Sequence, residues 1–139
     1  MRTWLLDTGP LVAYLDANEP AHDAVADSLD SFTGRLLTTG AVVTEAMHFV
    51  GGHRSGPELL LRFLEQSRAE IVECVRLAEL RATVALMEKY ADTPMDFADA
   101  MLVLAAAARE LEEVCTLDRR GFAIYRTPAG RAFRLVLNL

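Results

Sequence analysis

The sequence predicts an α/β fold: a three-layer α/β/α sandwich in which a central, mostly parallel sheet of four to five strands lies between layers of helices. Short runs of strand length alternate along the 139 residues with longer segments of helical periodicity. The strand-like runs are apolar throughout, which is typical of parallel strands covered on both faces. The length predicts one domain, residues 1–139, and a hydrophobic content of 52% supplies its core.

The first elements follow from apolar runs and their end signals. Trp4–Leu6 is a short apolar strand. The turn Thr8–Pro10 follows it, and a proline at the first helical position predicts a helix over Leu11–Leu15. Helical spacing predicts a second helix over His22–Phe32, and the apolar run Arg35–Thr38 predicts a second strand.

The middle of the chain continues the alternation. Gly40–Val50 is an expected helix that glycines end, and Pro57–Gln66 is another that starts near a proline. Glu70–Val75 is the expected third strand. Leu77–Tyr90 is an amphipathic helix, and its expected apolar face is formed by Leu77, Leu80, Val84 and Met87.

The last third holds the longest apolar helix. Thr93–Asp96 opens it, with Thr93 as the expected cap and proline at the first helical position, and it runs to about Leu111. Val114–Leu117 is the fourth strand. In the tail, apolar residues on both sides of Thr127–Gly130 predict either a hairpin or a final strand.

Asp99 is the most informative residue because it lies on this apolar helix. From Phe97 onward the helix is apolar on every face, so we expect it to be buried. An isolated ionised carboxylate on a buried helix is very costly, and the first basic residue on the helix is Arg109. Asp99 therefore needs a partner such as a metal ion. Asp96 is its i,i+3 neighbour, and two carboxylates that close repel by about 4 kcal/mol at an effective dielectric of roughly 20.

Three more acids lie at the edges of apolar segments. Asp7 and Asp118 each follow a strand, and Glu45 is the single acid of a mostly apolar helix. Each has a structural alternative: Asp7 and Asp96 as helix caps, Asp118 as the cap of a simple turn, and Glu45 as part of a solvated stripe.

The positions of these acids predict a shared ligand site, because sites in open parallel sheets form outside the carboxyl ends of the strands. Oxygen ligands without accompanying cysteine or histidine favour Mg²⁺ or Mn²⁺ over zinc. Thr8 and Thr116 adjoin the strand-end aspartates and could orient them through hydrogen bonds. Arg119 and Arg120 could touch a phosphate backbone or remain solvated surface charges.

The net charge of −6 argues at first against a nucleic-acid partner. Removing the five candidate site acids leaves 15 acids against 14 bases, a balance of −1. No apolar run approaches the ~20 residues that span a bilayer, and the start lacks the features of a signal peptide, so we expect a cytoplasmic protein without a membrane partner. Cys74 and Cys115 have no metal spacing and are expected to be inert core residues.

Four short motifs, in this order, resemble the PIN-domain family and in particular the VapC-type toxins of bacterial toxin–antitoxin pairs. They are the opening Leu5–Leu15, the Glu45-containing Thr38–Glu45, Asp96–Ala100 with its Asp-Ala pair, and Thr116–Phe122 with its Thr-x-Asp. The resemblance covers nearly the whole chain. It implies a PIN-like fold and a metal-dependent ribonuclease.

The resemblance also implies a cognate antitoxin that occludes the site, and a homodimer. The acids would be its catalytic residues (Asp7, Glu45, Asp99 and Asp118), with Asp96 as an additional metal ligand. Two alternatives stay open at this point. One is a catalytically silent PIN-like module that binds RNA or a protein. The other is a phosphatase or DNA nuclease with a similar ligand set.

Overall fold

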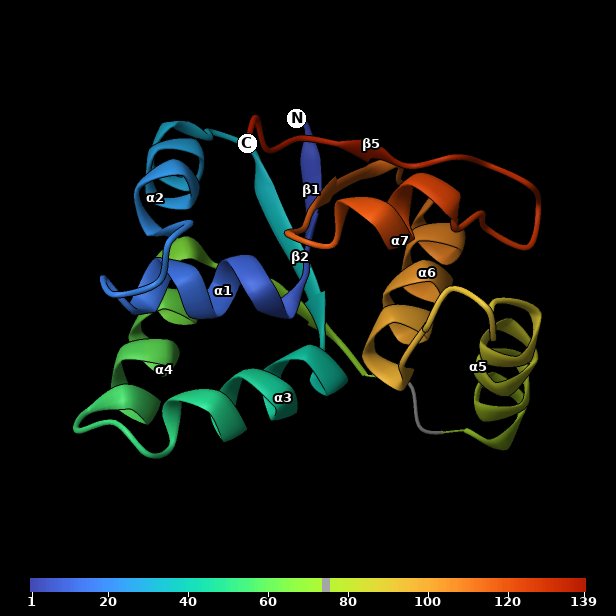
Figure 1. Ribbon diagram of the computed structural model, residues 1–139, viewed down its shortest axis with the longest axis horizontal. Coiled ribbons are helices and arrows are strands. Elements are labelled where there is room, and N and C mark those ends of the chain that lie inside the picture. Colours follow the sequence, from blue (N-terminus) through green and yellow to red (C-terminus); the bar gives the residue numbers. More distant parts are fainter. Residues whose placement is uncertain (74–75) are drawn as a thin grey trace.

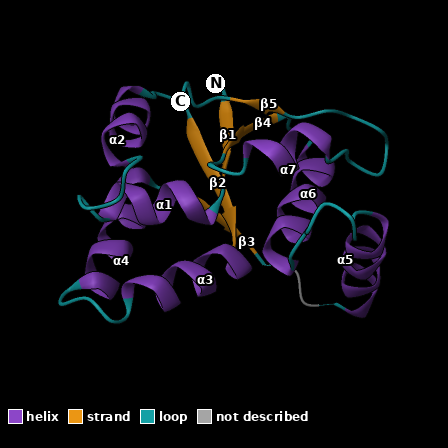
Figure 2. Cartoon of the chain, in the orientation of Figure 1, coloured by secondary structure: helices purple, strands orange, loops and turns teal. Residues whose placement is uncertain are grey.

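A computed structural model describes residues 1–73 and 76–139 and confirms the parallel sheet. Its five strands run in the order β3-β2-β1-β4-β5, and every neighbouring pair is parallel (Figure 2). The strands are β1 (Thr3–Leu6), β2 (Arg35–Thr39), β3 (Glu70–Val72), β4 (Glu113–Cys115) and β5 (Arg134–Leu135).

Helices cover both faces of this sheet, as expected of a three-layer sandwich (Figure 1). One layer contains α1 (Thr8–Leu15), α2 (His22–Ser31), α3 (Gly40–Val50) and α4 (Gly56–Ser67). The other contains α5 (Leu77–Lys89), α6 (Phe97–Arg109) and α7 (Arg119–Ile124). In the described part of the chain, the helices are all too short or too polar to span a membrane.

Successive strand residues point to opposite faces, so each continuous apolar run contributes side chains to two cores, one on each side of the sheet. In β1, Trp4 and Leu6 pack with the α1–α4 layer, whereas Leu5 packs with the α5–α7 layer. Leu36 and Leu37 of β2 divide in the same way. Full burial of each such leucine stabilises the fold by about 1.5–3 kcal/mol.

Helix α6 is the buried helix that the sequence predicts. Eight of its 13 residues are buried, and it packs against α3, α5 and β2. It begins three residues later than expected and ends at Arg109, where Glu110 takes the left-handed conformation with φ 53°. The expected end at Leu111 is therefore wrong by two residues. Its amino end lies near the carboxyl end of β1, as do the starts of α1 and α3 (Figure 1).

The expected apolar face of α5 is only partly correct. Leu80 and Met87 are half-buried, and Met87 packs against the core. Leu77 is 82% exposed and Val84 50% exposed, whereas Thr83 and Leu86 are buried. The Thr83 hydroxyl donates to the Leu80 carbonyl oxygen at 2.7 Å, so its polar atom is satisfied inside the helix. A periodicity count treats threonine as polar and therefore misses Thr83.

The C-terminal region also differs from expectation. The segment that Asp118 begins, for which a simple turn over residues 118–121 was one alternative, forms the short helix α7 over Arg119–Ile124. The tail forms the final parallel strand β5, and Arg126 and Ala132 make an isolated antiparallel bridge before it. Cys115 is free and buried, as predicted. The end of the predicted third strand, including Cys74, lies outside the described residues.

A matched pair of leucine substitutions tests this packing. Leu102, fully buried on α6, should lose about 2–5 kcal/mol of unfolding free energy in Leu102→Ala, because a cavity remains. Leu77→Ala on the exposed start of α5 should change it by less than about 0.5 kcal/mol. Urea denaturation measures both, and equal losses would mean that the face of α5 is assigned wrongly.

Candidate active site

The predicted site residues belong to segments that follow the carboxyl ends of the parallel strands. Asp7 follows β1 directly, and Thr116 and Asp118 follow β4. Glu45 lies on α3, the helix that starts immediately after β2, where the Thr39 side chain accepts a hydrogen bond from the Val42 amide at 3.2 Å. Strand pairing between β1, β2 and β4 brings these segments together.

Asp7 is buried and has partners for both carboxylate oxygens. It caps α1, with Oδ1 accepting from the Thr8 amide at 2.8 Å, and Oδ2 accepts from the Thr116 hydroxyl at 2.7 Å. The same Thr116 oxygen accepts from the Asp118 amide at 2.9 Å. Thr116 therefore connects the first and last predicted acids, which are 111 positions apart in the sequence.

Asp96 and Asp99 form a reciprocal capping box at the start of α6. Asp96 Oδ1 accepts from the Asp99 amide at 2.8 Å, and Asp99 Oδ2 accepts from the Asp96 amide at 3.1 Å. Two expectations are corrected here. The cap is Asp96 rather than Thr93, and Asp99 does have a local hydrogen-bond partner. Asp99 is only 9% exposed, and this hydrogen bond from a neutral backbone amide offsets part of the cost of burying its carboxylate.

The remaining two acids are more accessible. Asp118 is exposed and caps α7, with Oδ1 accepting from the Gly121 amide at 2.9 Å. Glu45 is half-buried within α3. Asp7, Asp96 and Asp118 each cap a helix, and each also lies close to other acids. The two alternatives for these residues, a helix cap and a member of an acidic cluster, therefore hold together.

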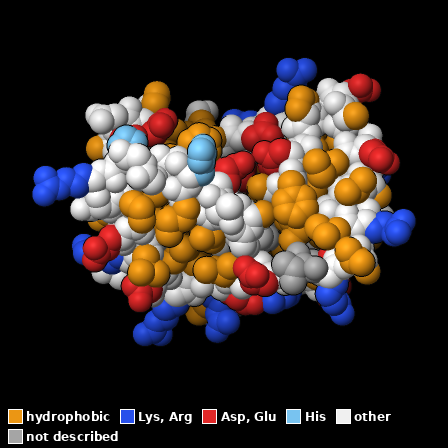
Figure 3. All heavy atoms as spheres, turned by 90° about the horizontal axis from the view of Figure 1, so that it is seen from below, with side chains coloured by type: hydrophobic (Ala, Val, Ile, Leu, Met, Phe, Trp, Pro, Cys, Tyr) orange, Lys and Arg blue, Asp and Glu red, His pale blue; other side chains and the backbone are white. Residues whose placement is uncertain are grey.

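Burial and neighbouring acids both raise the pKa values of Asp7 and Asp99. Burial raises the pKa of Asp7 to about 6, and the negative charges of Asp96 and Glu45 add to this rise. Burial also raises the pKa of Asp99 to about 8, with further contributions from Asp7, Asp96 and Asp118. None of the groups that shift these two pKa values is a cation. Acidic side chains gather accordingly near the centre of the face in Figure 3.

The donor set fits a hard divalent cation, although no three Asp, Glu, His or Cys side chains among the described residues are already arranged around an ion position. Carboxylate oxygens suit Mg²⁺ or Mn²⁺. The hydroxyl oxygen of Thr8 is buried beside Asp7 without a hydrogen-bond partner among the described residues, so it can accept or donate to a further group there. Burial raises the pKa of the nearby Cys115 thiol to about 12, which keeps it protonated and unsuited to metal binding.

The two arginines after Asp118 have different surroundings. Arg119 donates to the Leu137 carbonyl oxygen at 2.7 Å and so holds the C-terminal tail. Arg120 lines a cavity of about 110 Å³ together with Asp118 and Tyr125.

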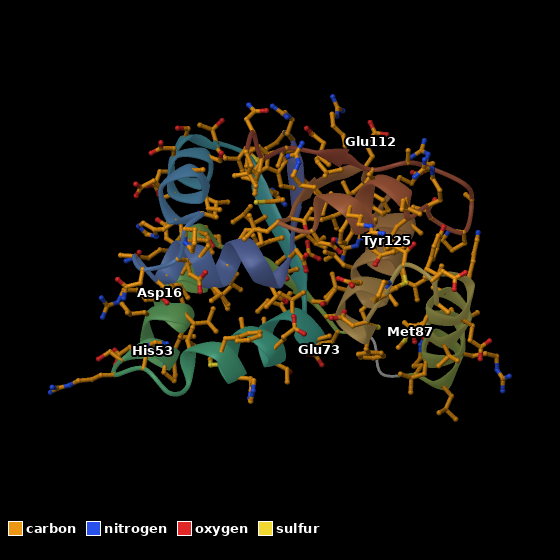
Figure 4. All side chains as sticks on the ribbon, viewed as in Figure 1. Asp16, His53, Glu73, Met87, Glu112 and Tyr125 are labelled. Atoms are coloured by element: carbon orange, nitrogen blue, oxygen red, sulfur yellow. The ribbon has the colours of Figure 1, made fainter. Side chains whose placement is uncertain are left out.

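Sequence reasoning missed two residues near this edge, Glu73 and Tyr125 (Figure 4). A methyl group on Gly40, at the start of α3, would overlap the Oε1 atom of Glu73. Glu73 follows β3 as Asp7 follows β1, whereas the expected third strand ran on to Val75 and so hid this position. Tyr125 is fully buried, and Asp99, Asp118, Asp96 and Asp7 all help to raise the pKa of its hydroxyl. No sequence motif pointed to it.

Individual proteins and solved structures are similar to this chain, whereas the family models are not. No protein-family model matches the chain. The chain is 33% identical over 135 residues to the ribonuclease VapC26 of Mycobacterium tuberculosis, covering 95% of this chain and 98% of that protein. Its fold is similar to the crystal structure of M. tuberculosis VapC20, a toxin that cleaves the sarcin-ricin loop, with a TM-score of 0.74 and 12% identity over 83% of this chain and 89% of that one. A toxin–antitoxin complex from Klebsiella pneumoniae matches with a TM-score of 0.63 and 21% identity, covering 87% and 91%.

The raised pKa of Asp99 predicts that the metal-free protein loses stability as the pH rises. The pKa is about 8 in the folded chain against an ordinary value of 3.8, so the folded state binds this proton more tightly than the unfolded state. The contribution is fully present below about pH 4 and is lost as the pH approaches about 8. We expect a fall in unfolding free energy on the order of 2 kcal/mol between pH 5 and pH 8, which lies below the upper limit of about 1.4 kcal/mol per pH unit for one proton.

Chemical denaturation in a chelating buffer between pH 5 and pH 8 would measure this fall. Asp99→Asn should flatten the dependence, whereas Asp27→Asn, at an exposed position on α2, should leave it unchanged. An Asp99→Asn protein with the same pH dependence as the wild type would contradict the assignment of the shift to Asp99.

Proposed function

The chain belongs to the VapC family of PIN-domain ribonuclease toxins from toxin–antitoxin pairs, and we propose that it hydrolyses RNA phosphodiester bonds with Mg²⁺ or Mn²⁺ held by its acidic cluster. The observation that carries this proposal is the burial of Asp7 and Asp99 among other acids without a cation among the groups that shift their pKa values. Two buried carboxylates in such surroundings are costly unless a cation or a proton neutralises them.

We propose Asp7 and Asp99 as the central metal ligands, with Glu45, Asp118 and Asp96 completing the set. Each aspartate has one oxygen fixed by a backbone amide, which orients the carboxylate before any ion arrives. The Asp96 Oδ2, Asp99 Oδ1 and Asp118 Oδ2 atoms accept no hydrogen bond from residues 1–73 or 76–139 and are available as ligands. A bound divalent cation supplies Lewis acidity and lowers the pKa of a coordinated water.

The remaining side chains orient the metal ligands, accept a proton or bind the RNA phosphates. The Thr116 hydroxyl holds Asp7 in one orientation and, through the Asp118 amide, fixes the start of α7. Glu45 and Asp118 are the more accessible acids, so they can accept the proton of the attacking water and pass it to solvent. Arg120 is the arginine we assign to the RNA phosphates, because Arg119 already donates to the Leu137 carbonyl oxygen.

The proposal extends to partners and location. We infer one domain over residues 1–139 and a cytoplasmic protein that meets RNA there, forms a homodimer and pairs with a cognate antitoxin. The relative VapC26 is matched over 98% of its length, which supports the single domain. The similarity of fold to a toxin–antitoxin complex supports an antitoxin partner. Cations in the acidic cluster would remove much of the repulsion between a chain of net charge −6 and RNA.

Asparagine substitutions test the catalytic assignment. Asp7→Asn and Asp99→Asn should each lower RNA cleavage at least about 100-fold, because a neutral amide is a poor ligand for Mg²⁺. Asp16→Asn is the matched control: Asp16 lies at the far end of α1 (Figure 4), and its Oδ1 accepts from the Asn18 amide at 2.9 Å. It should cleave at the wild-type rate.

Cleavage would be measured on a labelled RNA with Mn²⁺ and again with excess chelator, and circular dichroism would verify the fold of each variant. Wild-type cleavage that persists in chelator, or unchanged cleavage by both variants, would overturn the metal assignment. RNA binding without turnover at any metal concentration would favour the silent binding module.

Thr116→Val tests the residue that orients Asp7. Valine keeps the volume but removes the hydrogen bond, so the apparent Mn²⁺ affinity should fall about 10-fold. Thr83→Val is the control, since Thr83 is equally buried but its hydroxyl bonds within α5. Midpoints of Mn²⁺ titrations followed by melting temperature would give both values, and equal effects would contradict the role of Thr116.

A further inference from the structure

Tyr125 connects the segment that carries Asp118 to the segment that carries Asp96 and Asp99. It is fully buried at the end of α7, and its hydroxyl donates to the Pro94 carbonyl oxygen at 3.2 Å. Pro94 lies two residues before the cap of α6. The hydrogen bond therefore joins the ends of two segments that are far apart in the sequence.

Aromatic packing fixes the orientation of this ring. The Tyr125 ring packs edge-to-face with Phe122 at a centroid distance of 5.1 Å and with Tyr90 at 5.2 Å. Such edge-to-face pairs stabilise one ring orientation beyond the effect of buried area. The Tyr125 hydroxyl is consequently held against the 93–96 loop by a ring that has little freedom to turn.

Gly121 shows how closely Tyr125 approaches the acidic cluster. A methyl group on Gly121 would overlap Asp118 Oδ2 and would lie 2.9 Å from the Tyr125 hydroxyl oxygen. Glycine at this position lets Asp118 fold back to accept from the Gly121 amide while the tyrosine hydroxyl passes beside it. Tyr125, Asp118 and Pro94 also line one small cavity.

We propose that Tyr125 is a positioning residue that holds Asp118 at a fixed distance from Asp96 and Asp99. The acids of α6 and α7 can then bind the same cations. This inference rests on the proposed metal-dependent function. Tyr125 acts through the carboxylates and through the Pro94 backbone, and it does not itself touch the RNA. Residues that orient metal ligands commonly change metal affinity 10- to 100-fold when removed.

Tyr125→Phe tests the inference because it keeps the ring and removes the hydrogen bond. The Mn²⁺ concentration at the midpoint of the melting-temperature titration should rise about 10-fold. RNA cleavage should fall by a similar factor at limiting Mn²⁺ and recover at saturating Mn²⁺. Gly121→Ala, which displaces Asp118, should shift the midpoint in the same direction without removing any hydroxyl.

Tyr90→Phe is the matched control. Tyr90 is also buried and belongs to the same ring cluster, but its hydroxyl accepts from the Arg126 amide at 3.0 Å, so Tyr90→Phe leaves the hydrogen bond between Tyr125 and Pro94 in place. Its Mn²⁺ midpoint should stay within about twofold of the wild type.

Three outcomes decide the matter. A shift confined to Tyr125→Phe and Gly121→Ala supports the inference. Equal midpoints for Tyr125→Phe, Tyr90→Phe and wild type, with a normal wild-type response to Mn²⁺, would overturn the positioning role and leave the proposed function intact. A wild type whose melting temperature ignores Mn²⁺ would overturn the proposed function and this inference with it.

Discussion

Carboxylates fixed by backbone amides at the carboxyl edge of a parallel sheet are the interaction on which the site depends. In a parallel α/β arrangement, the end of each strand lies close to the start of the following helix, so free amides and strand ends occupy the same edge. Asp7, Asp96 and Asp118 each accept a hydrogen bond from such an amide. A capping bond of this kind contributes about 1 kcal/mol and orients one oxygen. The capping hydrogen bonds at the starts of the helices therefore also bring the negative charges of these aspartates together.

Capping and burial act in opposite directions on these acids. Hydrogen bonds from the Thr116 hydroxyl and the Thr8 amide favour the ionised form of Asp7, but burial has the larger effect and its pKa rises to about 6. For Asp99, neighbouring acids add to burial and the pKa rises further, to about 8. Asp99 therefore prefers the neutral form near pH 7 unless a cation binds, whereas Asp7 is mostly ionised at that pH in spite of its burial. Burying these acids lowers the free energy of unfolding, and the two apolar cores on either side of the sheet compensate for this loss.

Much of the fold could be predicted from the sequence because apolar runs and proline or glycine signals are local. The parallel sheet, the buried α6 and the five acids follow from such patterns. The predictions that failed concern residues that fit two local patterns at once. Thr83 counts as polar in a periodicity pattern, yet it is buried with its hydroxyl bonded inside its own helix, so the face of α5 was partly misplaced. The capping register of Asp96 was misread because Thr93 and Pro94 satisfy the same local pattern.

The hydrogen bonds that connect the candidate site could not be predicted, because they join segments far apart in the sequence. The acids could be identified one by one, but the Thr116 hydrogen bond that connects Asp7 with Asp118 depends on the pairing of β1 with β4. Tyr125 could not be found at all, because its importance lies in a backbone oxygen 31 residues earlier in the chain. Glu73 was overlooked because the expected third strand ran to Val75 and placed Glu73 inside it, whereas β3 ends at Val72.

The pairing of β1 with β4 has a consequence for synthesis on the ribosome. Leu5 pairs with Val114, so the two central strands meet only after more than a hundred residues of chain have been made. A nascent chain that stops short of β4 lacks the threonine that orients Asp7 as well as the last acid. The order of the elements therefore keeps an unfinished polypeptide from assembling the complete acidic cluster beside the messenger that encodes it.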